Sequence, residues 1–92
     1  MGFFFNTPKP RVTAIEWKKV RTSLFDRDFT KKEIDWIEGL FQGDLHETRP
    51  LDAGIQGDEI EQTIGWLRAN MTKHHLTDAK ITLLENALRL RL

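Results

Sequence analysis

The chain has 92 residues, of which 39% are apolar and 30% charged, and its formal net charge is zero. This length fits one domain, and the apolar content is too high for a disordered chain. The absence of cysteine excludes a disulfide framework, a thiol nucleophile and a cysteine-ligated zinc site. No apolar run approaches the roughly 20 residues of a membrane-spanning helix, and the first residues lack the order of a secretory signal, so we expect a cytoplasmic protein.

The first segment, residues 1–12, is expected to be an apolar and basic arm. Three consecutive phenylalanines precede a linker that contains prolines and cations. The rings have three interpretations: they fill a groove at the end of the domain, they insert shallowly into a membrane surface beside the cations, or they dock into a partner. The candidate anchor residues are Phe3, Phe4, Phe5, Lys9 and Arg11.

Four similar hexapeptides recur along the chain: VTAIEW, FTKKEI, IQGDEI and LTDAKI, starting at residues 12, 29, 55 and 76. Each has an apolar residue, a polar residue that is usually Thr, and a second apolar residue five positions after the first. A capping Thr accepts a backbone N–H one turn into a helix, a Glu three residues later returns the bond, and the apolar pair packs as a hydrophobic staple. The expected boxes are Thr13–Glu16, Thr30–Glu33 and Gln56–Glu59, whereas the fourth copy keeps Thr77 and has Lys80 in place of Glu. The signature predicts four helix starts.

The apolar residues after each start follow steps of three and four, as on one face of a helix. These stripes are Ala14, Trp17, Val20 and Leu24; Ile34, Ile37, Leu40 and Phe41; Ile60, Ile64, Leu67 and Met71; and Ile81, Leu84, Leu88 and Leu92. No segment alternates convincingly with period two. We therefore expect an all-α fold, a small four-helix bundle built from two hairpins in a single domain over residues 13–92. The expected helices are about 13–25, 30–42, 57–71 and 77–91.

The two hairpins also match each other in sequence. A shift of 47 residues lays 13–42 on 60–89 without a gap, and pairs Arg21 with Arg68 and Glu38 with Glu85. Two amphipathic hairpins can match by chance, so an internal duplication and a chance resemblance both stay open.

An acidic loop from Gly43 to Gln56 joins the hairpins. We expect Gly43 to cap the second helix and Gly54 to form the turn into the third. Residues 33–61 contain nine acidic side chains against Arg49 alone, a balance of −8. Long loops often carry binding functions, so this loop is a candidate specificity element.

The sequence does not contain the common motifs of metal-binding or catalytic sites. A calcium loop that started at Asp26 would place Lys31 and Ile37 at its sixth and twelfth positions, where Gly and Glu are needed. His74 and His75 are adjacent, and such a pair near a helix C-terminus more often favours the helix dipole than holds a metal. Glycine-rich phosphate loops, HExxH and GxSxG are missing from the sequence. We expect no enzyme activity, no catalytic residues, no metal and no cofactor.

Nucleic-acid binding is also disfavoured. Lys31 and Lys32 open the second helix, but Glu33, Asp35 and Glu38 follow them and would repel phosphate. A neutral chain also lacks the electrostatic attraction that dominates such binding.

Two helices have more apolar surface than one core requires. Side chains away from the main stripes would form a protein contact surface if they are exposed together. The candidate contact residues are Trp36, Trp66, Leu83 and Leu90. We therefore expect a non-enzymatic helical protein-interaction module that binds another protein or itself as a homodimer. The alternative is a peripheral membrane-surface or nucleic-acid-binding adaptor that uses the arm.

Overall fold

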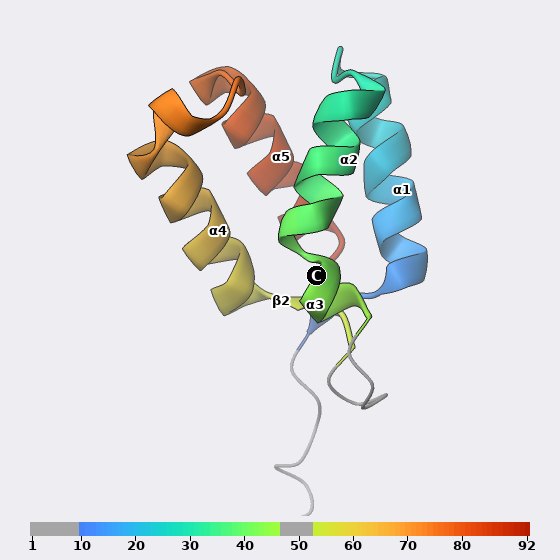
Figure 1. Cartoon of the computed structure of the whole chain (residues 1–92). Coiled ribbons are helices and arrows are strands. Elements are labelled where there is room, and N and C mark those ends of the chain that lie inside the picture. Colours follow the sequence, from blue (N-terminus) through green and yellow to red (C-terminus); the bar gives the residue numbers. More distant parts are fainter. Residues whose placement is uncertain (1–9, 47–52) are drawn as a thin grey trace, which may run out of the picture.

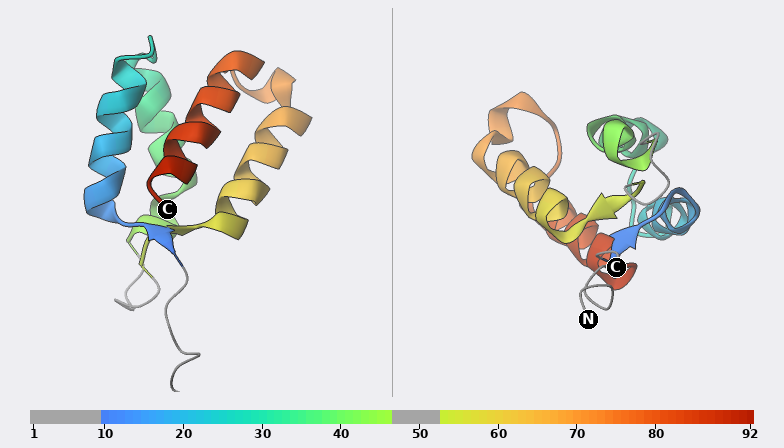
Figure 2. Two further views of the ribbon diagram at one scale, coloured as in Figure 1. Left: turned by 180° about the vertical axis from the view of Figure 1, so that it is seen from behind. Right: turned by 90° about the horizontal axis from the view of Figure 1, so that it is seen from below.

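Two helical hairpins make up the described part of the chain, which in this computed structural model covers residues 10–46 and 53–92. The bounds of the four long helices are α1 (Ala14–Phe25), α2 (Lys31–Leu40), α4 (Gly57–Ala69) and α5 (Asp78–Leu90). A short helix, α3 (Gln42–Leu45), follows α2, and a 3-10 turn, η2 (Met71–Lys73), follows α4. The all-α fold is therefore confirmed (Figure 1). The central helix is α5, which packs against both α4 and α1 (Figure 2).

The helix starts follow the predicted chemistry. The Thr30 hydroxyl accepts the Glu33 N–H at 3.1 Å, and the Glu33 carboxylate accepts the Thr30 N–H at 2.8 Å, which completes a capping box. The hydroxyls of Thr13 and Thr77 also cap their helices. Glu16 does not return the bond to Thr13 as a full box requires; its carboxylate pairs with lysine and arginine side chains instead. All eight residues of the expected staples are buried: Val12, Trp17, Phe29, Ile34, Ile55, Ile60, Leu76 and Ile81.

Two helix ends differ from the prediction. The second helix ends at Leu40 rather than at residue 42, and Phe41 separates it from α3. Gly43 lies inside α3, so the prediction that it caps the second helix was wrong. The third helix ends at Ala69 rather than at residue 71, because the chain tightens there into η2.

A two-stranded pairing, which the sequence analysis did not predict, ties the hairpins together. Strand β1 (Arg11–Val12) pairs antiparallel with β2 (Ile55–Gln56), and each strand leads directly into the first helix of its hairpin (Figure 2). Val12 and Ile55 are fully buried. Residues 11 and 12, which were assigned to the arm, thus belong to the folded domain.

Gly54 allows this close pairing. Its φ of +118° lies in the region that favours glycine, and a Cβ added there would lie 2.9 Å from the Val12 carbonyl oxygen. A side chain at this position would therefore clash with the neighbouring strand.

The predicted stripes form the core, except for Leu40, which is partly buried, and three exposed residues at helix ends. The buried apolar side chains are Val12, Trp17, Val20, Leu24, Phe29, Ile34, Ile37, Phe41, Leu45, Ile55, Ile60, Ile64, Leu67, Leu76, Ile81, Leu84 and Leu88. Ala14, Met71 and Leu92 are exposed, since Ala14 is the first residue of α1 and the other two lie past the ends of α4 and α5.

The same arginine contact closes both hairpins. Arg21 of α1 donates to Glu38 of α2 at 2.7 Å, and Arg68 of α4 donates to Glu85 of α5 at 3.4 Å. Each arginine also reaches a second acceptor one turn earlier in the partner helix, and the sequence separations of 17 and 14 residues are identical in the two hairpins. The two hairpins thus share this contact at equivalent positions of the sequence.

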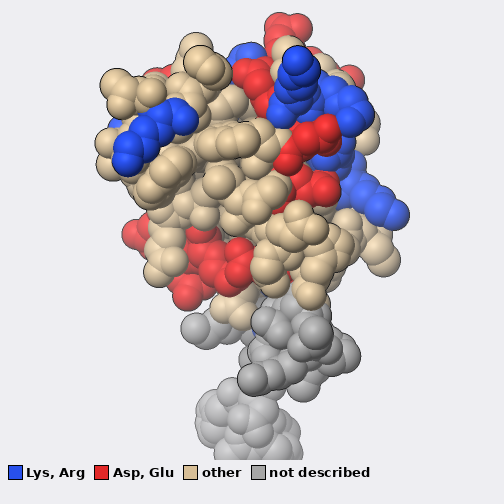
Figure 3. All heavy atoms as spheres, in the orientation of Figure 1, with Lys and Arg blue, Asp and Glu red and all other residues tan. Residues whose placement is uncertain are grey.

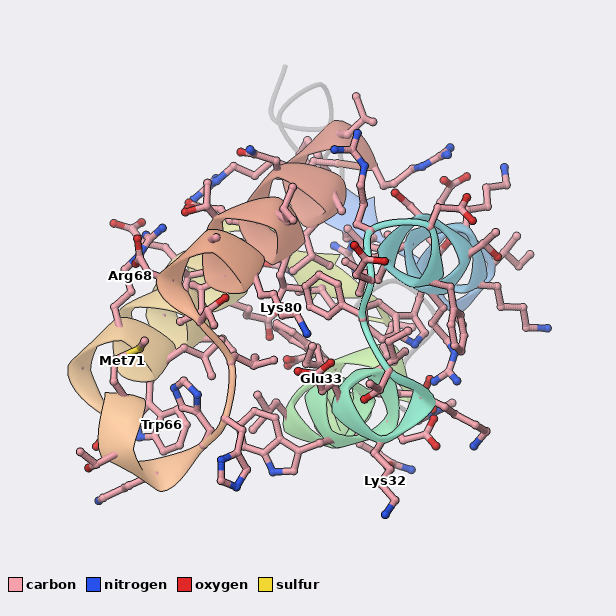
Figure 4. The ribbon with its side chains drawn as sticks, turned by 90° about the horizontal axis from the view of Figure 1, so that it is seen from above. Lys32, Glu33, Trp66, Arg68, Met71 and Lys80 are labelled. Atoms are coloured by element: carbon pink, nitrogen blue, oxygen red, sulfur yellow. The ribbon has the colours of Figure 1, made fainter. Side chains whose placement is uncertain are left out.

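Equivalent residues of the two hairpins meet at their boundary. Glu33 and Lys80 are 47 residues apart, and the Lys80 ammonium lies 2.9 Å and 3.0 Å from the two oxygens of Glu33. Figure 4 shows these side chains pointing toward one another between the hairpins. Lys80 also lies 5.3 Å from the centre of the buried Phe29 ring.

Candidate functional site

Two of the four predicted contact residues lie on either side of one histidine. The ring centre of His74 is 5.8 Å from that of Trp36 on α2 and 6.2 Å from that of Trp66 on α4. The two tryptophans are 39% and 42% exposed. We call Trp36, His74 and Trp66 the tryptophan face. It joins the first hairpin to the second.

His74 is held by hydrogen bonds at both ring nitrogens. The Leu76 N–H donates to Nδ1 at 3.2 Å, so Nδ1 is an acceptor and the neutral ring has its proton on Nε2. Nε2 then donates to the Leu67 carbonyl at 2.7 Å. That carbonyl belongs to the last turn of α4 and also accepts the Asn70 N–H at 3.4 Å. The two hydrogen bonds at the His74 nitrogens therefore fix the orientation of the ring that contacts both tryptophans.

Two shallow hollows lie along the tryptophan face. One has a volume of about 260 Å³ and is lined by Lys32, Glu33, Trp36, Lys73, His74, His75 and Leu76. The other has a volume of about 300 Å³ and is lined by Leu40, Gln62, Thr63 and Trp66. Both volumes are at or below the lower limit of typical small-molecule sites, roughly 300–1,000 Å³.

Charged and uncharged surface meet at these hollows. In Figure 3 a broad uncharged area covers α4 and extends toward α2, charged atoms cover the upper part of α2, and acidic atoms gather below the uncharged area where α4 begins. Asp58 and Glu59 stand in that first turn. Lys32 and Lys73 line the hollow beside Trp36, and Figure 4 shows Lys32 pointing outward. The uncharged surface thus lies between acidic side chains and lysines.

The other two predicted contact residues lie elsewhere. Leu83 is partly buried against the core, while Leu90 is 80% exposed. Both line a separate hollow of about 190 Å³ between α1 and α5. The four residues therefore do not form one surface.

Most of the arm and the middle of the acidic loop lie outside the described residues. Phe3, Phe4, Phe5 and Lys9 fall in the part that is not described, as do residues 47–52 of the loop. Of the predicted anchor residues the structure describes Arg11 alone, which is partly buried in β1.

Two carboxylates on α2, Asp35 and Glu38, connect α2 to α1 within the first hairpin. The pKa of Glu38 lies below its ordinary value of 4.5, first because the Trp17 indole N–H donates to it at 2.6 Å and also because Arg21 pairs with it. Hydrogen bonds from Lys31 and then Arg21 likewise lower the pKa of Asp35. A general acid at neutral pH needs a raised pKa, so these shifts run opposite to what that role requires.

Neither a metal site nor a membrane span stands out in the described residues. Groups of three or more His, Asp or Glu side chains that could hold a metal ion are missing from residues 10–46 and 53–92. None of the helices described has both the length and the apolar character to cross a bilayer.

The sequence placed the two tryptophans away from the main stripes and His74 near a helix C-terminus, but it did not predict that the three meet. His74 lies in the connection between α4 and α5, outside any helical period, so its contacts with the indoles could not be predicted from the period.

Comparisons of the chain with protein-family models, curated proteins and solved structures gave no match.

Proposed function

We propose that the chain is a non-enzymatic protein-interaction module and that the tryptophan face is its contact surface. The observation that carries this proposal is the pair of half-exposed indoles, Trp36 and Trp66, placed on two different helices around His74. Tryptophan is among the residues that contribute most to binding at protein interfaces, and such anchors cluster near the interface centre.

The way the face is held supports the same proposal. Because both nitrogens of His74 are bonded to the backbone, the ring between the indoles is already ordered before a partner arrives. A surface that is ordered in advance loses less conformational entropy on binding than a flexible one.

The chemistry of the carboxylates favours a binding role over catalysis. Glu33, Asp35 and Glu38 all have pKa values below their ordinary ones, and their partners are cations, an indole or a capped backbone. These carboxyls are therefore ionised at neutral pH, and their ion pairs and hydrogen bonds stabilise the fold. The alternative role at membranes or nucleic acids depends on the arm, of which the structure describes residues 10–12 alone, and Arg11 there is partly buried in β1.

A pull-down from the native host tests the proposal. The wild-type chain is compared with Trp36→Ala and Trp66→Ala, and with Leu90→Ala as a matched loss of apolar surface on another part of the molecule. We expect a bound protein, or an untagged copy of the chain, to be retained by wild type and Leu90→Ala and lost by both tryptophan variants. Circular dichroism checks that each variant folds.

Direct titration with the purified partner completes the test. Each tryptophan substitution should weaken binding by about tenfold or more, equivalent to about 1.4 kcal/mol. Equal retention of every bound protein by wild type and the tryptophan variants would overturn the proposal.

A further inference from the structure

The outward side of α4 has an unusually small residue at its centre. Gly65 lies in the middle of the helix and is exposed, and a Cβ built there meets nothing within 4 Å. Glycine inside a helix is unfavourable relative to alanine, and packing among the described residues does not offset that cost at Gly65. The neighbouring Trp66 is 42% exposed.

Charges of opposite sign lie at the two ends of the same helix. Asp58 stands in the first turn of α4 and accepts the N–H of Glu59, while Lys73 lies just past the helix in η2. Within the described part of the chain, neither forms an ion pair with another side chain. Four exposed residues between them, Gln62, Gly65, Trp66 and Ala69, are uncharged, whereas the exposed Glu61 and Arg68 lie beside them on the same helix.

The glycine, the tryptophan and the opposite charges of one α4 would match those of a second α4 that runs antiparallel to it. When two identical helices are related by a two-fold axis, each contact occurs twice and the start of one helix lies beside the end of the other. The midpoint between Asp58 and Lys73 falls between Gly65 and Trp66. An axis at that point places Asp58 near Lys73 of a second copy, and places Trp66 over the space above Gly65 of that copy.

We infer that the partner of the tryptophan face is a second copy of this chain, docked through antiparallel α4 helices. This inference rests on the proposed function and names its partner. Gly65 leaves room for the indole of the second copy, and the two Asp58–Lys73 pairs set the antiparallel direction. Because the chain has a formal net charge of zero, two copies have no overall charge repulsion to overcome when they approach.

Sedimentation equilibrium of the full chain, from low micromolar to millimolar concentration, measures the association. The first variant is Gly65→Gln, whose Cβ meets no described atom within 4 Å and whose longer side chain extends into the space above the helix. We expect it to weaken dimerisation at least about tenfold while its thermal midpoint, measured on dilute monomer, stays the same or rises. Leu90→Gln, on another part of the molecule, should dimerise like wild type.

Charge reversal tests the direction of the pair. Asp58→Lys and Lys73→Glu each place like charges opposite one another and should weaken the dimer on the order of tenfold at low salt. The double variant restores opposite charges at both contacts and should dimerise like wild type. Failure of the double variant to recover, or an unchanged dissociation constant for Gly65→Gln, would overturn the antiparallel arrangement.

The inference and the proposed function fail in different ways. A wild-type chain that stays monomeric at millimolar concentration, but retains another protein in a manner that needs Trp36 and Trp66, overturns only the second copy as partner. A monomer without any tryptophan-dependent partner overturns both.

Discussion

Replacing Glu33 tests the contact that joins the two hairpins. Its carboxylate accepts the Thr30 N–H at 2.8 Å in the capping box and also pairs with the Lys80 ammonium at 2.9 Å. The side chains of Glu33 and Lys80 are only 19% and 25% exposed, so water screens this pair less than an open surface pair. Loss of the hydrogen bond to the Thr30 N–H lowers the free energy of unfolding by about 1 kcal/mol. Loss of the ion pair with Lys80, which is partly screened from water, lowers it by about 1 kcal/mol more. We expect Glu33→Ala to lower the free energy of unfolding by about 2 kcal/mol.

Urea unfolding followed by tryptophan fluorescence measures this loss, and a double-mutant cycle separates its two parts. Glu33→Gln keeps an acceptor for the cap, so its cycle with Lys80→Met isolates the charged pair, with an expected coupling of about 1 kcal/mol. The control is the cycle of Lys31→Met with Asp35→Asn, because those side chains are 73% and 45% exposed. That coupling should stay below about 0.5 kcal/mol.

The same pair predicts a pH dependence. Burial by itself would raise the pKa of Glu33, but the hydrogen bond from the Thr30 N–H and the pairing with Lys80 outweigh it and hold the pKa below the ordinary 4.5. A carboxyl whose folded pKa is lowered contributes its full stability above the unfolded pKa, and loses it as the pH falls through the folded pKa. The stability difference between wild type and Glu33→Gln should therefore be constant near neutral pH and shrink on acidification below pH 4.5. A coupling near zero at neutral pH, or a difference that grows in acid, would refute the reasoning.

Three further substitutions test the packing. Trp17→Phe removes the hydrogen bond that the indole N–H donates to Glu38 at 2.6 Å. NMR titration should then show a higher pKa for Glu38, and the free energy of unfolding should fall by about 1 kcal/mol. An unchanged pKa would contradict this role of the indole. Arg21→Met should be more destabilising than Arg68→Met in urea, because the two side chains are 22% and 41% exposed, and equal losses would count against the comparison. Phe41 is fully buried, so Phe41→Ala should lose about 3–5 kcal/mol and be largely unfolded by circular dichroism. A wild-type unfolding midpoint for that variant would disprove its place in the core.

The helix starts were predictable because their chemistry is local. The capping box of Thr30 and Glu33 and the staple of Phe29 with Ile34 lie within six residues, so they can be recognised without knowledge of the rest of the chain. The buried stripes were predictable for a related reason, since the helical period alone decides which side chains share a face.

The exact residues at which the helices end were harder to predict from the sequence. Leu40 ends α2 although the apolar pattern continues into Phe41, because Phe41 packs fully buried where the chain turns into α3. Helix ends depend on what the neighbouring elements leave room for, which the period does not record.

The candidate site divides along the same line. The sequence alone determined that Trp36 and Trp66 lie away from the main stripes of their helices, because that follows from the helical period. Only the tertiary structure decided that both meet His74, that Leu83 and Leu90 lie elsewhere, and that Val12 pairs with Ile55. The strands are two residues long and the histidine lies in a turn, so neither has a period to recognise. Their positions depend on contacts between residues far apart in the chain, which form only when the two hairpins pack together.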